Sequence, residues 1–68
     1  MTNEQRAEEA RQALQYFKSR LGHNCDVETL AIDLVADILH LLEREGVDYA
    51  RVLRTAEGHF HAEKEEVS

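Results

Sequence analysis

Hydrophobic residues are concentrated in the middle of this chain, and their spacing there is helical. Over residues 26–45 they recur three and four positions apart, which places side chains on a shared side of an α-helix. They cover more than half of the helix circumference, whereas a surface helix usually has an apolar stripe about 100° wide. The pattern therefore predicts a central helix that must be covered on several sides. Its apolar positions are Val27, Leu30, Ala31, Ile32, Leu34, Val35, Ile38, Leu39, Leu41 and Leu42.

The segments on either side carry narrower apolar stripes. Residues 2–20 begin with Thr2 and Gln5, the spacing of a helix capping box. Residues 48–62 form a second flanking helix whose stripe we expect to face inward. The stripe of the first segment contains Ala7, Ala10, Leu14, Phe17 and Leu21, and that of the last contains Tyr49, Val52, Leu53, Ala56 and Phe60.

Glycines and helix-capping residues between the periodic segments complete the fold prediction. Gly22 and Gly46 follow the first two helices, as glycine commonly does at a helix C-terminus. Asn24 or Asp26 is expected to cap the second helix, and Asp48 the third. We therefore predict an all-α three-helix bundle with helices at about 2–20, 26–45 and 48–62. It is one domain over residues 1–68, with frayed N-terminal residues and a charged C-terminal tail from about residue 63.

Composition restricts the partners. The chain has 68 residues and one cysteine, so no disulfide can form within it. A domain this short buries only about 60% of the surface that its unfolded chain exposes, and such domains often need a partner subunit. The polar N-terminal sequence and the lone thiol favour the cytoplasm, and no apolar run is long enough for a membrane span. We expect no membrane partner.

Charge argues against nucleic acid as a partner. Fourteen acidic residues against eight basic ones give a formal net charge of −6, and nucleic acids repel such a chain. The turn before residue 48 has the length of a helix-turn-helix turn. However, only Arg51 and Arg54 could contact DNA from the helix that follows, and Asp48 opens that helix.

The breadth of the central apolar surface predicts an interface. Two narrow flanking stripes cannot cover it, and exposed apolar patches of a few hundred Å² normally mark contact sites. A two-fold homodimer is the commonest way to cover such a patch, and another protein could also bind there. The residues expected at the interface are Ile32, Val35, Leu39 and Leu42.

Three polar residues on the central helix raise the possibility of a metal site. Asp33, Asp37 and His40 are spaced i, i+4 and i+7, so they share one helix face and could ligate a divalent cation. A metal-dependent phosphohydrolase would use such residues but needs further acidic ligands. The plainer interpretation is a solvated polar face, and we expect no cofactor.

Other candidate groups are less complete. Cys25 lies beside His23 near the start of the central helix, where a thiol pKa can be depressed, but no second cysteine accompanies it. The pairs His59–Glu63 and Glu57–His61 have i, i+4 spacing and lack the further ligands of a zinc site. We find no catalytic residue set.

One resemblance extends over the second half of the chain. Residues 33–42, 46–49 and 56–60 carry it, with the sequences DLVADILHLL, GVDY and AEGHF. Together they resemble small uncharacterised helical proteins of bacterial genomes and mobile elements, over Asp33 to Phe60. The resemblance implies a helical fold and no particular activity.

These observations favour a non-catalytic role over an enzyme. The first hypothesis is a helical protein–protein interaction module or small regulator acting as a homodimer. An alternative is an acidic inhibitor that mimics nucleic acid and acts on a nucleic-acid-binding protein, and a second alternative is the phosphohydrolase-like protein. The acidic alternative depends on Glu4, Glu8, Glu9, Glu63, Glu65 and Glu66.

Overall fold

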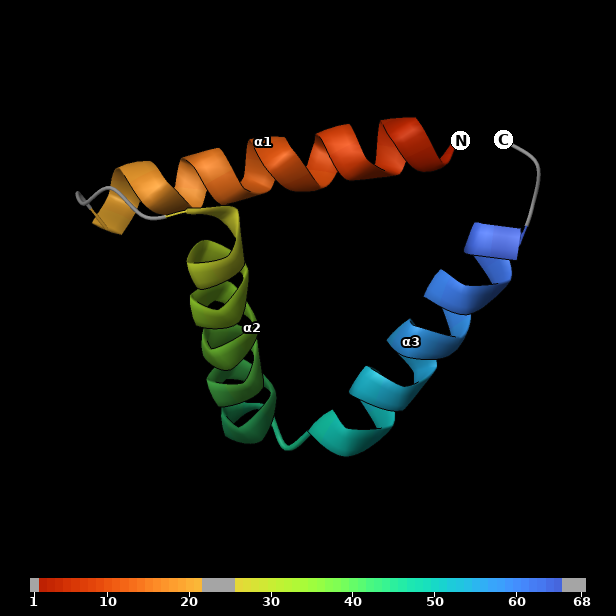
Figure 1. Ribbon diagram of the computed structural model, residues 1–68. Coiled ribbons are helices and arrows are strands. Elements are labelled where there is room, and N and C mark those ends of the chain that lie inside the picture. The colour runs from red at the N-terminus through yellow and green to blue at the C-terminus, as the bar shows by residue number, and fades with distance from the viewer. Residues whose placement is uncertain (1, 22–25, 66–68) are drawn as a thin grey trace.

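The described part of the chain is entirely helical in its regular structure. The computed structural model describes residues 2–21 and 26–65, which contain three α-helices and no strand. They are α1 (Asn3–Leu21), α2 (Val27–Arg44) and α3 (Tyr49–Glu65) (Figure 1). The all-α, three-helix expectation is confirmed. The third helix runs three residues beyond its expected end at residue 62.

The starts of α1 and α2 are set by short-range hydrogen bonds. The Thr2 backbone amide donates to Gln5 Oε1 at 2.8 Å, and the Gln5 amide donates to Thr2 Oγ1 at 3.1 Å, which forms the expected capping box. Asp26 caps α2 by accepting a hydrogen bond from the Thr29 amide at 2.9 Å. Hydrogen bonds from the Thr29 side chain and amide hold the pKa of the Asp26 carboxyl below its usual range. Gly22 and Asn24 lie outside the described residues.

The turn between α2 and α3 has the hydrogen bonds of a Schellman motif. Gly46 has φ +72°, a left-handed conformation that glycine adopts without steric strain. Its amide donates to the Glu43 carbonyl at 3.2 Å, and the Val47 amide donates to the Leu42 carbonyl at 2.9 Å. Asp48 then starts α3 by accepting a hydrogen bond from the Arg51 amide at 3.2 Å. Both the terminal role of Gly46 and the capping role of Asp48 are confirmed.

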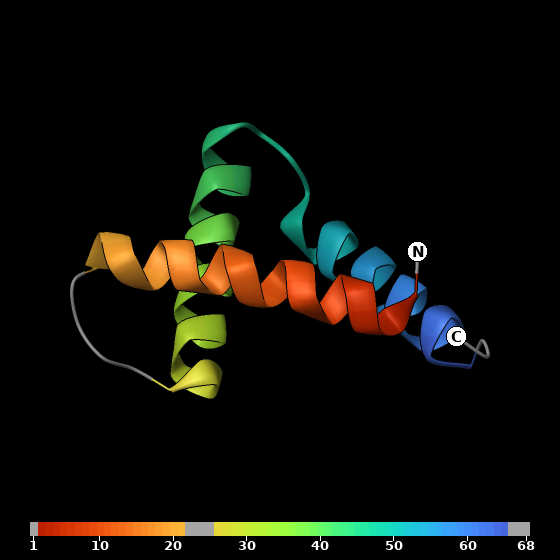
Figure 2. The ribbon, with the colours of Figure 1, turned by 90° about the horizontal axis from the view of Figure 1, so that it is seen from above.

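The helices form the three sides of an open triangle. The start of α2 lies against the middle of α1, α2 and α3 meet at the turn that joins them, and α3 returns toward the start of α1 (Figures 1 and 2). The Cα radius of gyration is 13.5 Å, against about 11 Å for a close-packed chain of this length. The principal extents are 37 × 29 × 17 Å, so the molecule is a flat, expanded arrangement.

Polar groups join the third corner of the triangle. Asn3 Nδ2 donates to the Glu63 carbonyl at 2.8 Å, and Arg6 Nε lies 3.6 Å from Glu63 Oε2. Arg6 Nη1 also donates to Asn3 Oδ1 at 2.7 Å, which links the two α1 residues to each other. We call this set of Asn3, Arg6 and Glu63 the corner clasp. Glu63, where the charged tail was expected to begin, lies within α3 and contacts α1 through this clasp.

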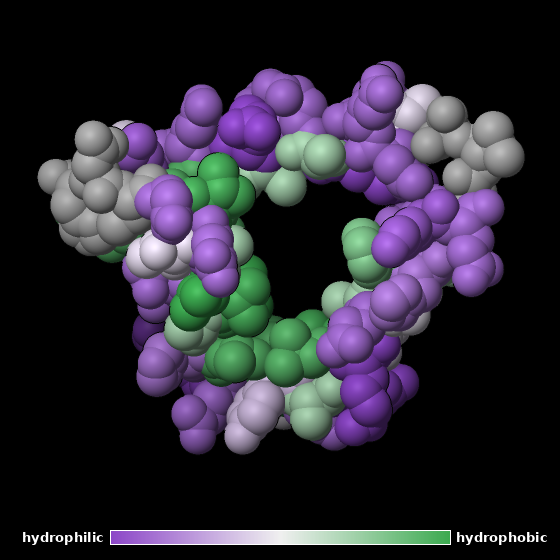
Figure 3. All heavy atoms as spheres, in the orientation of Figure 1, coloured by the Kyte–Doolittle hydropathy of each residue, from purple (hydrophilic) through white to green (hydrophobic). Residues whose placement is uncertain are grey.

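Little of the chain is buried. Among the described residues Leu30 alone is buried, at 4% exposure. The total accessible surface is 5816 Å² for 7.8 kDa, whereas a folded monomer of that mass exposes about 4,400 Å². The expectation that the α3 stripe faces a core is wrong, since Tyr49, Val52, Leu53 and Phe60 are all exposed. The three helices surround an opening (Figure 3), so no further layer covers these side chains.

Candidate interaction surface

The face of α2 that we expected to be an interface is open in the structure. Ile32 is 61% exposed and Val35 is 43% exposed, while Leu39 and Leu42 are half-buried. Leu30 is buried near the start of α2, and backbone hydrogen bonds form the turn after its end. The exposed face therefore belongs to a helix that is ordered at both ends. The structure therefore presents apolar side chains to solvent on a defined surface.

A shallow hollow of about 450 Å³ lies on this face. Three of the four expected interface residues line it, namely Ile32, Val35 and Leu39. Two small residues, Ala31 and Ala36, complete the lining, and their short side chains leave room for another helix to approach closely. We call these five residues the α2 hollow. Leu42 is not part of it, and its carbonyl instead takes part in the turn into α3.

The hydrophobic surface extends from α2 toward α3. Figure 3 shows hydrophobic side chains gathered over α2 and around the corner where α2 meets α3. They border an opening between the helices that side chains do not close in this view. The exposed large apolar residues of α2, α3 and the turn between them are Val27, Ile32, Val35, Ile38, Leu41, Val47, Tyr49, Val52, Leu53 and Phe60.

Several of these exposed residues were not assigned to the interface from the sequence. Ile38 and Leu41 belong to the broad apolar arc of α2, and Val47 precedes the cap of α3. The signal that could have found the first two was present, because the arc is too wide for two narrow stripes to cover. For the α3 residues no such signal existed, since a narrow stripe looks the same whether it faces a core or solvent.

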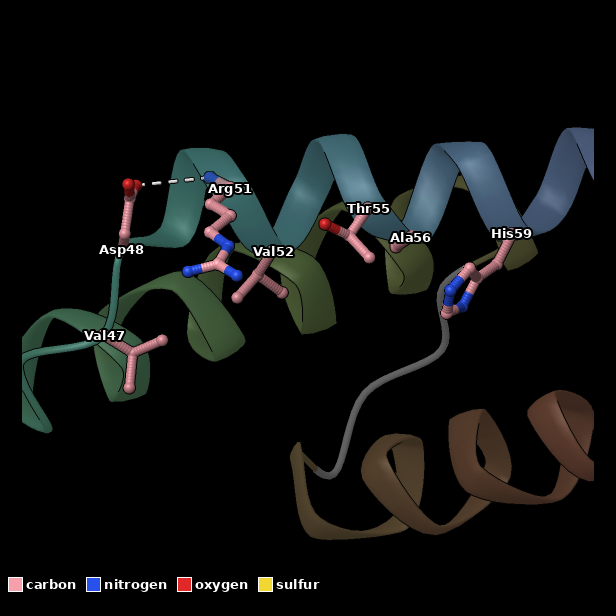
Figure 4. Close-up of a pocket in the computed structure, with 7 residues that line it drawn as sticks. All are labelled: Val47, Asp48, Arg51, Val52, Thr55, Ala56 and His59. Atoms are coloured by element: carbon pink, nitrogen blue, oxygen red, sulfur yellow. Dashed lines mark hydrogen bonds between the residues drawn. The ribbon is translucent and has the colours of Figure 1, made fainter.

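A second hollow, of about 500 Å³, follows the first turns of α3 (Figure 4). Val52, Ala56 and Val47 give it apolar walls, and Arg51 and His59 extend beside them. The Asp48 carboxylate, also at this hollow, accepts a hydrogen bond from the Arg51 backbone amide (Figure 4). Val47 and Val52 line the same space, as expected for residues that flank a helix cap.

The polar stripe of α2 lies apart from the apolar hollow. Asp33 is half-buried, whereas Asp37 and His40 are exposed. No group of three or more His, Cys, Asp or Glu side chains that could hold a metal ion occurs within residues 2–21 and 26–65. Asp33, Asp37 and His40 therefore do not form such a group with one another or with other described residues.

The remaining histidines and the cysteine add no complete site. The His61 ring lies edge-on to Phe60 with centroids 5.3 Å apart, and Lys64 Nζ is 5.9 Å from the Phe60 centroid. These contacts partly cover an aromatic ring that is otherwise exposed. Cys25 and His23 lie outside the described residues, so the expectation about the thiol stays a prediction.

Comparisons with known proteins add no assignment. Nothing matched this chain among protein-family models, curated proteins or solved structures. None of the three described helices has the combination of length and apolarity that a membrane crossing requires.

Proposed function

We propose that this chain is a non-catalytic, helical protein–protein interaction module whose binding surface is the apolar face of α2. The observation that supports the proposal is the exposure of Ile32 and Val35 around the α2 hollow. Ile32 and Val35 are presented by a capped helix, so they form a shaped surface. Such patches are typical of protein interfaces.

Physical chemistry favours a protein partner over a small molecule or an ion. The lining of the α2 hollow is made of alkyl side chains, which offer no hydrogen bond to orient a polar ligand. A helix or apolar segment of a protein needs no such bond, because area removed from water drives its binding. Burying this face at about 25 cal/mol per Å² supplies the free energy of association, less the entropy of immobilisation.

Position-specific photocrosslinking tests the proposal. A benzophenone amino acid is placed at Ile32, inside the α2 hollow, and the full chain is produced in cells and irradiated. The matched control carries the same group at Tyr16, which is 67% exposed on α1 and outside the hollow. We expect a protein adduct from position 32 that is much stronger than any adduct from position 16.

Both outcomes of this experiment are informative. An adduct confined to position 32 supports a specific protein contact at the α2 hollow. Equal adducts at the two positions, or none at position 32, would contradict the proposal. The mass of the adduct also identifies the partner: twice the 7.8 kDa chain mass means a second copy, and any other mass means a different protein.

A further inference from the structure

Resting on the proposed function, we infer that the partner at the α2 face is a second copy of this chain. The two copies join by the apolar face of α2 on which the α2 hollow lies. In a two-fold dimer the same patch serves on both copies, so one self-complementary surface is sufficient. The α2 hollow lies at this contact, and Ile32 and Val35 of each copy become buried.

The area of the exposed surface fits a dimer of this kind. Each chain exposes 5816 Å², which exceeds the value for a compact monomer of its mass by about 1,400 Å². If two copies cover that excess, the dimer interface totals about 2,800 Å², within the range of about 2,000–5,000 Å² seen for obligate homodimers. A weak transient contact would need less than half of this area.

The small buried core of the chain also favours a partner that is always present. Leu30 alone is buried among the described residues, whereas an independent domain needs a contiguous core to offset the entropy of ordering its chain. The chain therefore requires a partner in order to fold. A second copy is present wherever the chain is made, at the same concentration, which no other protein guarantees.

The positions of the charged groups are compatible with this pairing. Each copy has a formal net charge of −6, so two copies repel unless their acidic groups stay in water. The lining of the α2 hollow contains no ionisable side chain. Asp33 is half-buried, while the carboxylates of Glu28, Asp37 and Glu43 on α2 are exposed. Dimerisation through this face leaves those carboxylates solvated. Added salt should consequently strengthen the dimer by screening the repulsion.

The test is the solution mass of the full chain, with melting as a second readout. Sedimentation equilibrium at tens of micromolar should give twice 7.8 kDa. Because the dimer unfolds to two separate chains, a tenfold higher concentration should raise the Tm by about 5 °C. Neither measurement requires a variant that folds.

Two aspartate variants locate the interface. Val35→Asp places a charge in the α2 hollow, and we expect dimerisation to weaken at least about a hundredfold, with a lower Tm. Tyr16→Asp makes a similar change at an exposed position of α1 and should keep both the mass and the concentration dependence of the Tm.

The mass and melting measurements test the second-copy inference separately from the proposed function. A folded monomer with a concentration-independent Tm would overturn the second-copy inference. A dimer that Val35→Asp leaves intact would also overturn it, because the copies would then pair elsewhere. In either case a position-32 crosslink to another protein would keep the interaction module, whereas the absence of any such crosslink would remove both.

Discussion

At the residue scale, the fold perturbs the ionisation of the Asp26 carboxylate. It accepts a hydrogen bond from the Thr29 amide at 2.9 Å, at the positive end of the α2 dipole. Hydrogen bonds from Thr29 lower its pKa in the folded state. Because the folded pKa lies below the unfolded one, the carboxylate stabilises the fold above the unfolded pKa. That stabilisation is lost as the pH falls through the folded pKa.

We therefore expect Asp26→Ala to lower the Tm at pH 7 and to lose this effect at a pH below the folded pKa. There the wild-type carboxyl is protonated and is a weaker acceptor. Thermal melts of both proteins from pH 7 to pH 2.5 measure the difference. Asp26→Asn is the control, since asparagine caps helices about as well as aspartate. A Tm difference for Asp26→Ala that is independent of pH would contradict the assignment.

At the element scale, two glycines allow the effect of backbone conformation on stability to be measured without a change in packing. Gly46 ends α2 with φ +72°, and Gly58 lies within α3. A methyl group added at either position would meet no atom within 4 Å. Any effect of alanine at these sites therefore comes from the backbone.

Gly46→Ala should destabilise the protein by about 1–2 kcal/mol, because an L-residue is strained in the left-handed region. Gly58→Ala should stabilise it by about 0.5–1 kcal/mol, because alanine loses less entropy than glycine when a helix forms. Urea denaturation of both variants, at one protein concentration, measures the two free energies of unfolding. Effects of the same sign would show that one of the two backbone conformations is incorrect.

At the scale of the whole molecule, the corner clasp joins the two ends of the chain. Asn3 and Glu63 are 60 positions apart, and the Arg6 and Glu63 side chains are 33% and 36% exposed. Partly exposed ion pairs typically contribute about 0.2–1 kcal/mol and are screened by salt. The clasp orients α3 relative to α1 and supplies little of the stability.

Glu63→Gln should accordingly lower the free energy of unfolding by no more than about 1 kcal/mol at low salt, and by less in 1 M salt. The Asn3 hydrogen bond survives the substitution, because its acceptor is the Glu63 backbone carbonyl. Glu65→Gln, two residues further along α3, is the matched control for the loss of one negative charge. A loss of several kcal/mol that is insensitive to salt would mean that the clasp is a principal stabilising contact.

Much of the local structure follows from sequence alone. The capping box of Thr2 and Gln5, the caps at Asp26 and Asp48 and the terminal role of Gly46 were predicted and are confirmed. Each depends on hydrogen bonds between residues a few positions apart, so neighbouring side chains are sufficient to specify it. The exposure of Ile32 and Val35 was also predictable, because the apolar arc of α2 is too broad for two helices to cover.

Only the tertiary structure decided how the helices lie relative to one another. It exposes the stripe of Tyr49, Leu53 and Phe60, which the sequence alone had placed facing inward, and it brings Glu63 to Arg6. Periodicity specifies which side of a helix is apolar, but it carries no information about the distance or angle to the next helix. Those depend on contacts between residues far apart in the chain. Here such contacts are confined to the corners of the triangle, so the α2 face stays open for a partner.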